Sequence, residues 1–315
     1  MIQYNASDCL LIADSGSTKT AWCMASPAGE RILLHTRGIN PAIQSETDIS
    51  AILREDLLPR LHDEADFRQV SRIYFYGAGC LPSVRAGMQQ LLEILLPGTK
   101  AEVESDLLGA ARALCGHNAG IACILGTGSN SCLYDGHDIV QHVSPLGYIL
   151  GDEGSGASLG KHFAGNLLKG LLASDLREAF ARDFNLTESD IIRRVYREPG
   201  ANRFLASLTV FMHQHRQHPD IHALTTECFK DFFRRNVDAY GRKDLPLRFT
   251  GSIAHYFSNE LHEAAEQCGY RIDEIMQAPI GRLTDYHLQN ARENRAEEGF
   301  FGKKDAINAK TCSKA

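Results

Sequence analysis

Two short turns rich in glycine and hydroxyl residues, at 14–20 and 126–131, recur in the two halves of the sequence. They read Asp-Ser-Gly-Ser-Thr-Lys-Thr and Gly-Thr-Gly-Ser-Asn-Ser, and each lies between two apolar runs typical of β-strands. Glycine lets the backbone approach an anion closely, and clustered N–H and hydroxyl groups can donate hydrogen bonds to it. Each turn is therefore predicted to be the tip of a β-hairpin, and the pair is predicted to hold phosphate.

The first turn differs from the common P-loop. That motif has four residues between its first glycine and a Gly-Lys-Ser/Thr end and is followed by a helix, whereas the run after residue 20 is again strand-like. For one such turn alone, an ordinary glycine hairpin would be the better interpretation. Its repetition favours two facing hairpins that enclose one polyphosphate.

The predicted elements follow a similar order in both halves, which indicates an internal duplication. The first half has strands 9–14, 20–26 and 32–36, helix 46–61, strand 73–76, helix 82–95, strand 101–105 and helix 106–115. The second half has strands 121–125, 132–134 and 138–143, four or five helices over 154–240, strand 245–250, helix 254–268, strand 270–277 and a helix from about 281.

A chain of 315 residues exceeds the usual size of one domain, so we expect two. The predicted boundaries give a small domain at 1–117, a larger domain at 118–284 and a last helix at 285–298 that packs on the small domain. Residues 299–315 lack periodicity and are predicted to be a mobile tail.

The composition favours a small molecule as partner. The net charge is −6, the isoelectric point is near 6.1, and no long basic run precedes the tail, so neither nucleic acid nor a membrane is an expected partner. The sequence has no stretch of about 18 uncharged apolar residues and no export signal, which predicts a cytoplasmic protein.

The cysteines and histidines do not form a metal-binding pattern. The nine cysteines lie mostly inside apolar runs without a C-x-x-C pair, as expected for buried free thiols in a reducing compartment. His213, His215, His218 and His222 do not share one helical face, and Pro219 interrupts them, so a polar helix end or loop explains them better than a metal site.

Four motifs together resemble the hexokinase, actin and sugar-kinase superfamily: 14–20, 105–111 (Ser-Asp-Leu-Leu-Gly-Ala-Ala), 125–131 and 147–156. Within it, the chain is most similar to the N-acetylglucosamine kinase family, which includes glucosamine kinases and the ATPase activators of radical acyl-CoA enzymes. The resemblance extends from about residue 10 to 288. It implies an α/β fold of two duplicated ribonuclease H-like (actin-like ATPase) domains with ATP in the cleft between them.

The resemblance assigns roles to two aspartates. Asp106 is expected to be the general base that accepts the proton of a sugar hydroxyl as it attacks the γ-phosphate of ATP. A plain helix N-cap also explains an aspartate there, and the two roles can coexist. Asp14 is expected to hold Mg²⁺ through water, and stabilisation of the turn by its side chain is the alternative.

The other expected contacts divide between the nucleotide and the sugar. Residues 250–254 resemble the adenosine loop of the superfamily, although a generic strand-to-helix turn would look much the same. Asp152 is expected to contact the sugar, and Asp152 or Ser155 is expected in addition to cap the helix at 157–170. The nucleotide contacts are Gly16, Ser17, Thr18, Lys19, Gly126, Thr127, Gly128 and Ser129 for phosphate, and Gly251 and Ser252 for adenosine. The sugar contacts are Asn40, Asp106, Asn130, Gly147, Tyr148 and Asp152.

The predicted function is ATP-dependent phosphorylation of an amino sugar, N-acetylglucosamine to its 6-phosphate. The chain departs from the animal enzymes at Pro41-Ala42, where they carry an aromatic residue, and at 144–147, where they carry tryptophan. These departures leave glucosamine, N-acetylmuramic acid or another hexose derivative open as substrate, and a homodimer is left open as well.

Two other classes of protein compete with the kinase. The activator ATPases carry a Lys-Cys-Ala-Ala-Gly-Thr-Gly loop and share an iron–sulfur cluster between subunits, whereas Cys123 of this chain lies inside an apolar strand. A sugar sensor without enzymatic activity is the third class, and the intact Asp14 and Asp106 argue against it.

Overall fold

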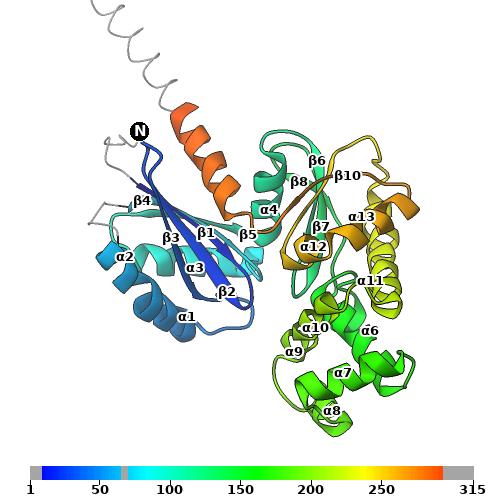
Figure 1. Cartoon of the computed structure of the whole chain (residues 1–315). Helices are drawn as coiled ribbons and strands as arrows, with labels where there is room; N and C mark the ends of the chain where they lie inside the picture. Colours follow the sequence, from blue (N-terminus) through cyan, green and yellow to red (C-terminus); the bar gives the residue numbers. More distant parts are fainter. Residues whose placement is uncertain (1–8, 65–69, 294–315) are drawn as a thin grey trace, which may run out of the picture. The chain divides into compact units, whose positions relative to one another are not determined.

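The computed structural model describes residues 9–64 and 70–293 (Figure 1). The chain forms two compact units: unit 1 comprises the residues up to Gly109 and those from Ile280 onward, and unit 2 is Ala110–Pro279. The boundaries predicted from the sequence, 117/118 and 284/285, lie further along the chain. The predicted tail at 299–315 and the end of the predicted last helix lie outside the described residues.

Unit 1 contains a five-stranded mixed sheet among its described residues, in the order β3-β2-β1-β4-β5. The first three strands are an antiparallel meander, and β4 and β5 continue the sheet parallel to β1. The parallel strands end together, because Ser15 pairs with Gly77 and Gly77 with Ser105. The strands are β1 (Cys9–Ser15), β2 (Lys19–Ala25), β3 (Arg31–Arg37), β4 (Val70–Gly77) and β5 (Lys100–Ser105).

Helices cover both faces of this sheet. Ile73 and Phe75 of β4 point into a core shared with the helices that follow β3 and β4, whereas the alternating Tyr74 and Tyr76 meet His287 of the helix at 280–293. The helix predicted at 46–61 contains a π-helical turn. The helices are α1 (Glu46–Ile52), the π-helical η1 (Leu53–Leu57), α2 (Leu58–Glu64), α3 (Pro82–Leu95) and α4 (Asp106–Cys115).

Unit 2 repeats the same sheet topology in its described strands, with the order β10-β9-β6-β7-β8. Strands β6, β7 and β8 form an antiparallel meander, and β9 and β10 are parallel to β6. The shared order confirms the predicted fold class of two duplicated α/β domains. The strands are β6 (Gly120–Leu125), β7 (Ser129–Tyr134), β8 (Ile139–His142), β9 (Leu247–Thr250) and β10 (Ile272–Met276).

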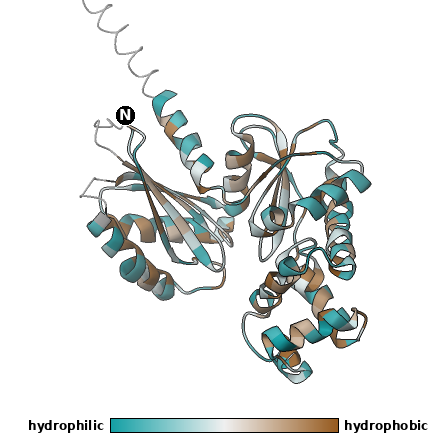
Figure 2. Cartoon of the chain, in the orientation of Figure 1, coloured by the Kyte–Doolittle hydropathy of each residue, from teal (hydrophilic) through white to brown (hydrophobic). Residues whose placement is uncertain are grey.

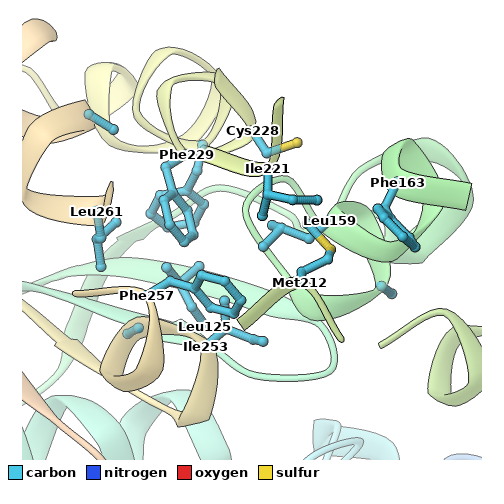
Figure 3. Close-up of a cluster of buried hydrophobic side chains, with 14 of the residues drawn as sticks. Leu125, Leu159, Phe163, Met212, Ile221, Cys228, Phe229, Ile253, Phe257 and Leu261 are labelled. Atoms are coloured by element: carbon cyan, nitrogen blue, oxygen red, sulfur yellow. The ribbon is translucent and has the colours of Figure 1, made fainter. Parts of the chain in front are cut away.

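The helices that follow β8 and precede β9 in the sequence supply most of the buried side chains in the core of unit 2. These amphipathic helices carry hydrophilic and hydrophobic faces in Figure 2, and Figure 3 shows the buried side chains, among them Phe163, Met212 and Phe229. The helices include α6 (Gly156–Leu168), α7 (Ser174–Phe184), α8 (Glu188–Tyr196), α9 (Ala201–Ser207), α10 (Thr209–Gln214) and α11 (Pro219–Phe232), then the π-helical η2 (Phe233–Val237) and the 3-10 helix η3 (Asp238–Tyr240).

Two predictions for these helices were wrong. The sequence predicted four or five helices over 154–240, whereas the structure has six α-helices there, α6 to α11. The extra division lies at Leu208, between α9 and α10, where no glycine or proline marks it in the sequence. The helix predicted at 254–268 is also two, α12 (Ser252–Tyr256) and α13 (Ser258–Gln267), which are divided at Phe257. Phe257 is buried in the core, so tertiary packing rather than a local breaker sets this division.

The cysteines within residues 9–64 and 70–293 are free thiols, and all but the half-buried Cys268 are buried. No helix in this part of the chain combines the length and apolar character needed to span a membrane. No group of three or more histidine, cysteine, aspartate or glutamate side chains in it could hold a metal ion.

The core of unit 2 gives a matched test of packing with the same substitution at two leucines. Leu261→Ala, in α13, removes a fully buried side chain and is expected to lower the free energy of unfolding by about 2–5 kcal/mol. Leu171→Ala, at a side chain that is 67% exposed, is expected to change it by less than about 0.5 kcal/mol. Urea denaturation followed by circular dichroism measures both, and equal effects would contradict this core.

Candidate functional site

Two carboxylates lie at the carboxyl edge of the unit 1 sheet. Asp14 is near the end of β1, and Asp106, directly after β5, is the first residue of α4. Burial, together with the negative charge of Asp106, raises the pKa of Asp14 to about 7 against the opposing effect of Lys19. Burial also raises the pKa of Asp106 to about 6. The strand register thus brings together two carboxylates that repel each other.

The cap of α4 is Ser105 rather than Asp106. Ser105 Oγ accepts a hydrogen bond from Leu108 N at 3.2 Å, the geometry of an N-cap. Asp106 Oδ1 accepts one from the backbone N of Leu107 at 2.9 Å. Ser105 therefore supplies the N-cap bond, and Asp106 satisfies one further N–H group of the first turn.

The first glycine turn is fixed on one side and exposed on the other. Gly16 N donates to Lys19 O at 3.0 Å, and residues 16–19 are exposed within unit 1. A Cβ atom at Gly38 would lie 2.5 Å from Gly16 O, so the chain after β3 packs directly on the turn. The buried Ser15, which sequence reasoning missed as a positioning residue, donates from Oγ to Ile39 O at 2.8 Å.

Asn40 lies near the same edge of the sheet. Its Oδ1 accepts a hydrogen bond from Ala42 N at 3.1 Å, and its backbone N donates to Gln44 Oε1 at 2.6 Å. A Cβ atom at Gly79, two residues after β4 ends, would overlap Asn40 Oδ1. Unit 1 therefore gathers Asp14, Asn40, Asp106 and the first turn beside the ends of its parallel strands.

The second glycine turn is held by the helix that follows the 147–156 motif. Gly126 N donates to Gly128 O at 2.9 Å and closes the hairpin between β6 and β7. The first turn of α6 donates to its carbonyls, from Gly156 N to Gly126 O at 2.8 Å and from Ala157 N to Thr127 O at 3.0 Å. The motif and the turn therefore form one structure within unit 2.

Asp152 contacts the second turn and does not cap α6. Its Oδ1 accepts a hydrogen bond from Ser129 N at 3.2 Å, and burial raises the pKa of its carboxyl group. The cap is Ser155, whose side chain accepts from Ser158 N at 3.1 Å. Asp152 has a φ of 53°, a left-handed conformation that aspartate adopts more readily than most residues other than glycine.

The other predicted sugar contacts lie on β7 and on the short helix α5 (Gly147–Leu150). Asn130 Oδ1 lies 2.8 Å from His142 Nε2, a partner that the sequence did not indicate. The half-buried Tyr148 accepts a hydrogen bond at its carbonyl from Lys161 Nζ at 3.2 Å. The apolar side chains of Leu146, Ile149 and Leu150 are all more than 60% exposed.

The predicted adenosine loop follows β9. Gly251 has a φ of 116°, and a Cβ atom there would overlap the carbonyl oxygen of Leu125, the last residue of β6. Ser252 is exposed at the start of α12. The loop therefore adjoins the strand that leads into the second turn, at the carboxyl edge of the unit 2 sheet.

The carboxylate of Asp14 fits magnesium. Mg²⁺ is usually held in nucleotide sites by one or two carboxylates together with water and phosphate oxygens, rather than by a complete protein cage. Asp14 supplies such a carboxylate, and a cation beside it would offset the burial and the repulsion from Asp106 that raise its pKa. The donor set suits an ion that arrives with a phosphate ligand.

Comparison with protein-family models and with curated proteins gave no match. Among solved structures, the chain is similar to a protein of Porphyromonas gingivalis provisionally assigned as an N-acetylglucosamine kinase, with 47% identity and a TM-score of 0.86 over 90% of this chain and 99% of that chain. A Chromobacterium violaceum protein with the same provisional assignment has 20% identity and a TM-score of 0.71 over 90% and 99%.

The ethanolamine utilization protein EutJ of Carboxydothermus hydrogenoformans has 14% identity and a TM-score of 0.51 over 87% of this chain and 86% of that chain. The two similarities below 25% identity establish the actin-like ATPase fold alone. The similarity to the Porphyromonas protein extends over almost all of both chains. The chain therefore belongs to the N-acetylglucosamine kinase family.

Proposed function

We propose that this protein transfers the γ-phosphoryl group of ATP to an amino sugar, converting N-acetylglucosamine to its 6-phosphate. Membership of a sugar-kinase family supports the reaction class. The single observation that carries the proposal is the Asp14 and Asp106 pair, placed beside a glycine turn at the carboxyl ends of parallel strands, where α/β proteins commonly bind ligands.

Asp106 is the proposed general base. A base works best when its pKa is close to the pH at which it operates, and burial raises the pKa of Asp106 to about 6. Leu107 N donates to Oδ1, and this hydrogen bond restrains the rotation of the carboxylate. As the oxygen of that hydroxyl bonds to the γ-phosphorus, its proton passes to Asp106 and the bond to the leaving ADP oxygen breaks.

The two glycine turns are the proposed phosphate-binding elements. Gly16, Ser17, Thr18 and Lys19 are exposed within unit 1, so the hydroxyls of Ser17 and Thr18 and the ammonium of Lys19 can reach an anion that approaches Gly16. Residues 126–129 of unit 2 carry the second set of donors. The backbone at 251–252, which lies beside Leu125 at the end of β6, is the proposed contact of the nucleoside.

Asp14 is the proposed magnesium residue. Bound Mg²⁺ would neutralise charge that develops on the phosphates, the usual contribution of this ion to phosphoryl transfer. A cation beside Asp14 favours its carboxylate form and thus opposes the burial and repulsion that raise its pKa to about 7. The positive charge of Lys19 likewise lowers the pKa of Asp14.

The proposed sugar contacts are Asn40, Asn130 and the 147–152 segment. Carboxylate and amide groups bind sugar hydroxyls well, and Ser129 N fixes the carboxylate of Asp152. The exposed Ile149 and Leu150 offer an apolar surface near Asp152 in sequence, which suits the methyl of an N-acetyl group better than the ammonium of glucosamine. This surface takes the place of the missing aromatic residues.

The activator alternative is disfavoured by the burial of Cys123. Its side chain is fully buried in β6, and burial raises the pKa of the thiol well above its ordinary value. A cluster ligand must be an accessible thiolate. The buried free thiols of the described chain also suit a reducing compartment, which supports a cytoplasmic location.

Replacement of the base tests the proposed chemistry. Asp106→Asn is expected to lower kcat for sugar phosphorylation by about 10²–10⁴-fold, because the amide cannot accept the proton, while ATP affinity stays within about twofold. Asp138→Asn, at an exposed aspartate of unit 2, is the control and keeps the unsubstituted rate. Turnover by coupled ADP release that survives in Asp106→Asn would remove Asp106 as the base.

The pH dependence of turnover follows from the same carboxylate. The base acts when ionised, so kcat is expected to be highest above pH 6 and to fall as the pH decreases through about 6, where Asp106 takes up a proton. An acid limb with its midpoint near 4, the ordinary range of an aspartate, would contradict a buried base. The profile is measured with saturating ATP and sugar.

The apolar turn gives a test of sugar choice. The double variant Ile149→Ser and Leu150→Ser is expected to lower kcat/KM for N-acetylglucosamine roughly tenfold and to leave kcat/KM for glucosamine nearly unchanged, since only the acetylated sugar gains from an apolar contact. Leu171→Ser, at another exposed leucine, serves as control. Equal losses for both sugars would exclude this surface as the acetyl contact.

A further inference from the structure

Tyr76 links the C-terminal helix to the strand beside Asp14. Its side chain is 1% exposed, and its Cα pairs with that of Asp14 across β4 and β1. Its hydroxyl lies 2.8 Å from Nε2 of His287, which is itself 4% exposed. Tyr74 stacks on the same imidazole with a centroid distance of 3.6 Å. The phenol of Tyr76 therefore has a fixed, buried partner.

The ring of Tyr76 packs on the backbone of α4. A Cβ atom at Gly109 would lie 2.8 Å from Cγ and Cδ1 of Tyr76 and 2.9 Å from its Cβ, closer than side chains tolerate. Gly109 is three residues after Asp106, so this contact lies one helical turn from the proposed base. Glycine weakens a helix interior, and its presence here lets α4 approach the ring.

The helix at 280–293 is anchored firmly on unit 1. Leu283 and Thr284 are fully buried, and Asp285 forms an ion pair with Arg31 at the start of β3. The chain passes from unit 1 to unit 2 within α4, at Gly109/Ala110, and returns at Pro279/Ile280, where this helix begins. Tyr76 therefore contacts both segments through which the chain leaves and re-enters unit 1.

We propose that Tyr76 is a positioning residue for Asp106: His287 fixes the phenol, and the ring sets how closely the first turn of α4 approaches β4. This inference rests on the proposed function, in which Asp106 is the base. A buried phenol normally requires a hydrogen-bond partner, which explains a histidine at this place on the helix. The C-terminal helix thereby contributes to catalysis without contacting substrate.

The test adds one methyl group to α4. Gly109→Ala pushes the helix from the ring of Tyr76, and Gly87→Ala in α3, where a Cβ atom meets nothing within 4 Å, is the matched control. Gly109→Ala is expected to lower kcat at least tenfold, to change ATP affinity less than twofold, and to shift the acid-limb midpoint of kcat because the surroundings of Asp106 change. Gly87→Ala is expected to retain the unsubstituted values.

A second variant keeps the test decisive if Gly109→Ala does not fold. Tyr76→Phe retains the ring and removes its bond to His287, and it is expected to lower kcat severalfold with the same midpoint shift and unchanged ATP affinity. If Asp106→Asn is inactive but the folded variants keep the unsubstituted kcat and midpoint, the positioning role is wrong and the proposed function stands. If Asp106→Asn itself retains full turnover, Asp106 is not the base and the positioning role is wrong with it. If the unsubstituted protein releases no ADP in response to sugar, the proposed function is wrong.

Discussion

The register of three parallel strands is the constraint on which the rest of the unit 1 site depends. Since β1, β4 and β5 end together, a carboxylate near the end of the first strand and one just beyond the last come within electrostatic range. Both are partly buried, and their ionised forms repel each other, an arrangement that is unfavourable without a cation. The N-cap bond of α4 does not require Asp106, because Ser105 supplies it.

The duplication supplies two equivalent turns but different acids. In unit 1 the carboxylate of Asp14 comes from the strand that leads into the turn, whereas β6 of unit 2 ends in Leu125. The acid of unit 2, Asp152, instead precedes α6 and reaches Ser129 N from outside the hairpin. The same sheet topology thus presents its acids from different elements in the two copies.

Much of the fold was predictable because local sequence patterns determine its strands and several of its helices. Alternating apolar runs and glycine turns located the strands of both sheets, and helices 82–95 and 106–115 agree with α3 and α4. Long-range packing was not predictable. The division at Phe257 and the glycine at 109 depend on partners far away in sequence, and one sequence does not identify those partners. For the same reason, the sequence did not show that Ser105 rather than Asp106 caps α4, or that Ser155 rather than Asp152 caps α6.

The most direct test of the central claim is a ¹³C NMR titration of the Asp14 and Asp106 carboxyl groups. The account predicts pKa values of about 7 for Asp14 and about 6 for Asp106 in the free protein. It also predicts that the pKa of Asp14 falls in Asp106→Asn, because the like charge is removed, and falls again when Mg²⁺ and a non-hydrolysable ATP analogue are added. Two independent titrations near 4, unaffected by the substitution and by the metal nucleotide, would contradict a coupled carboxylate pair at a phosphoryl-transfer site.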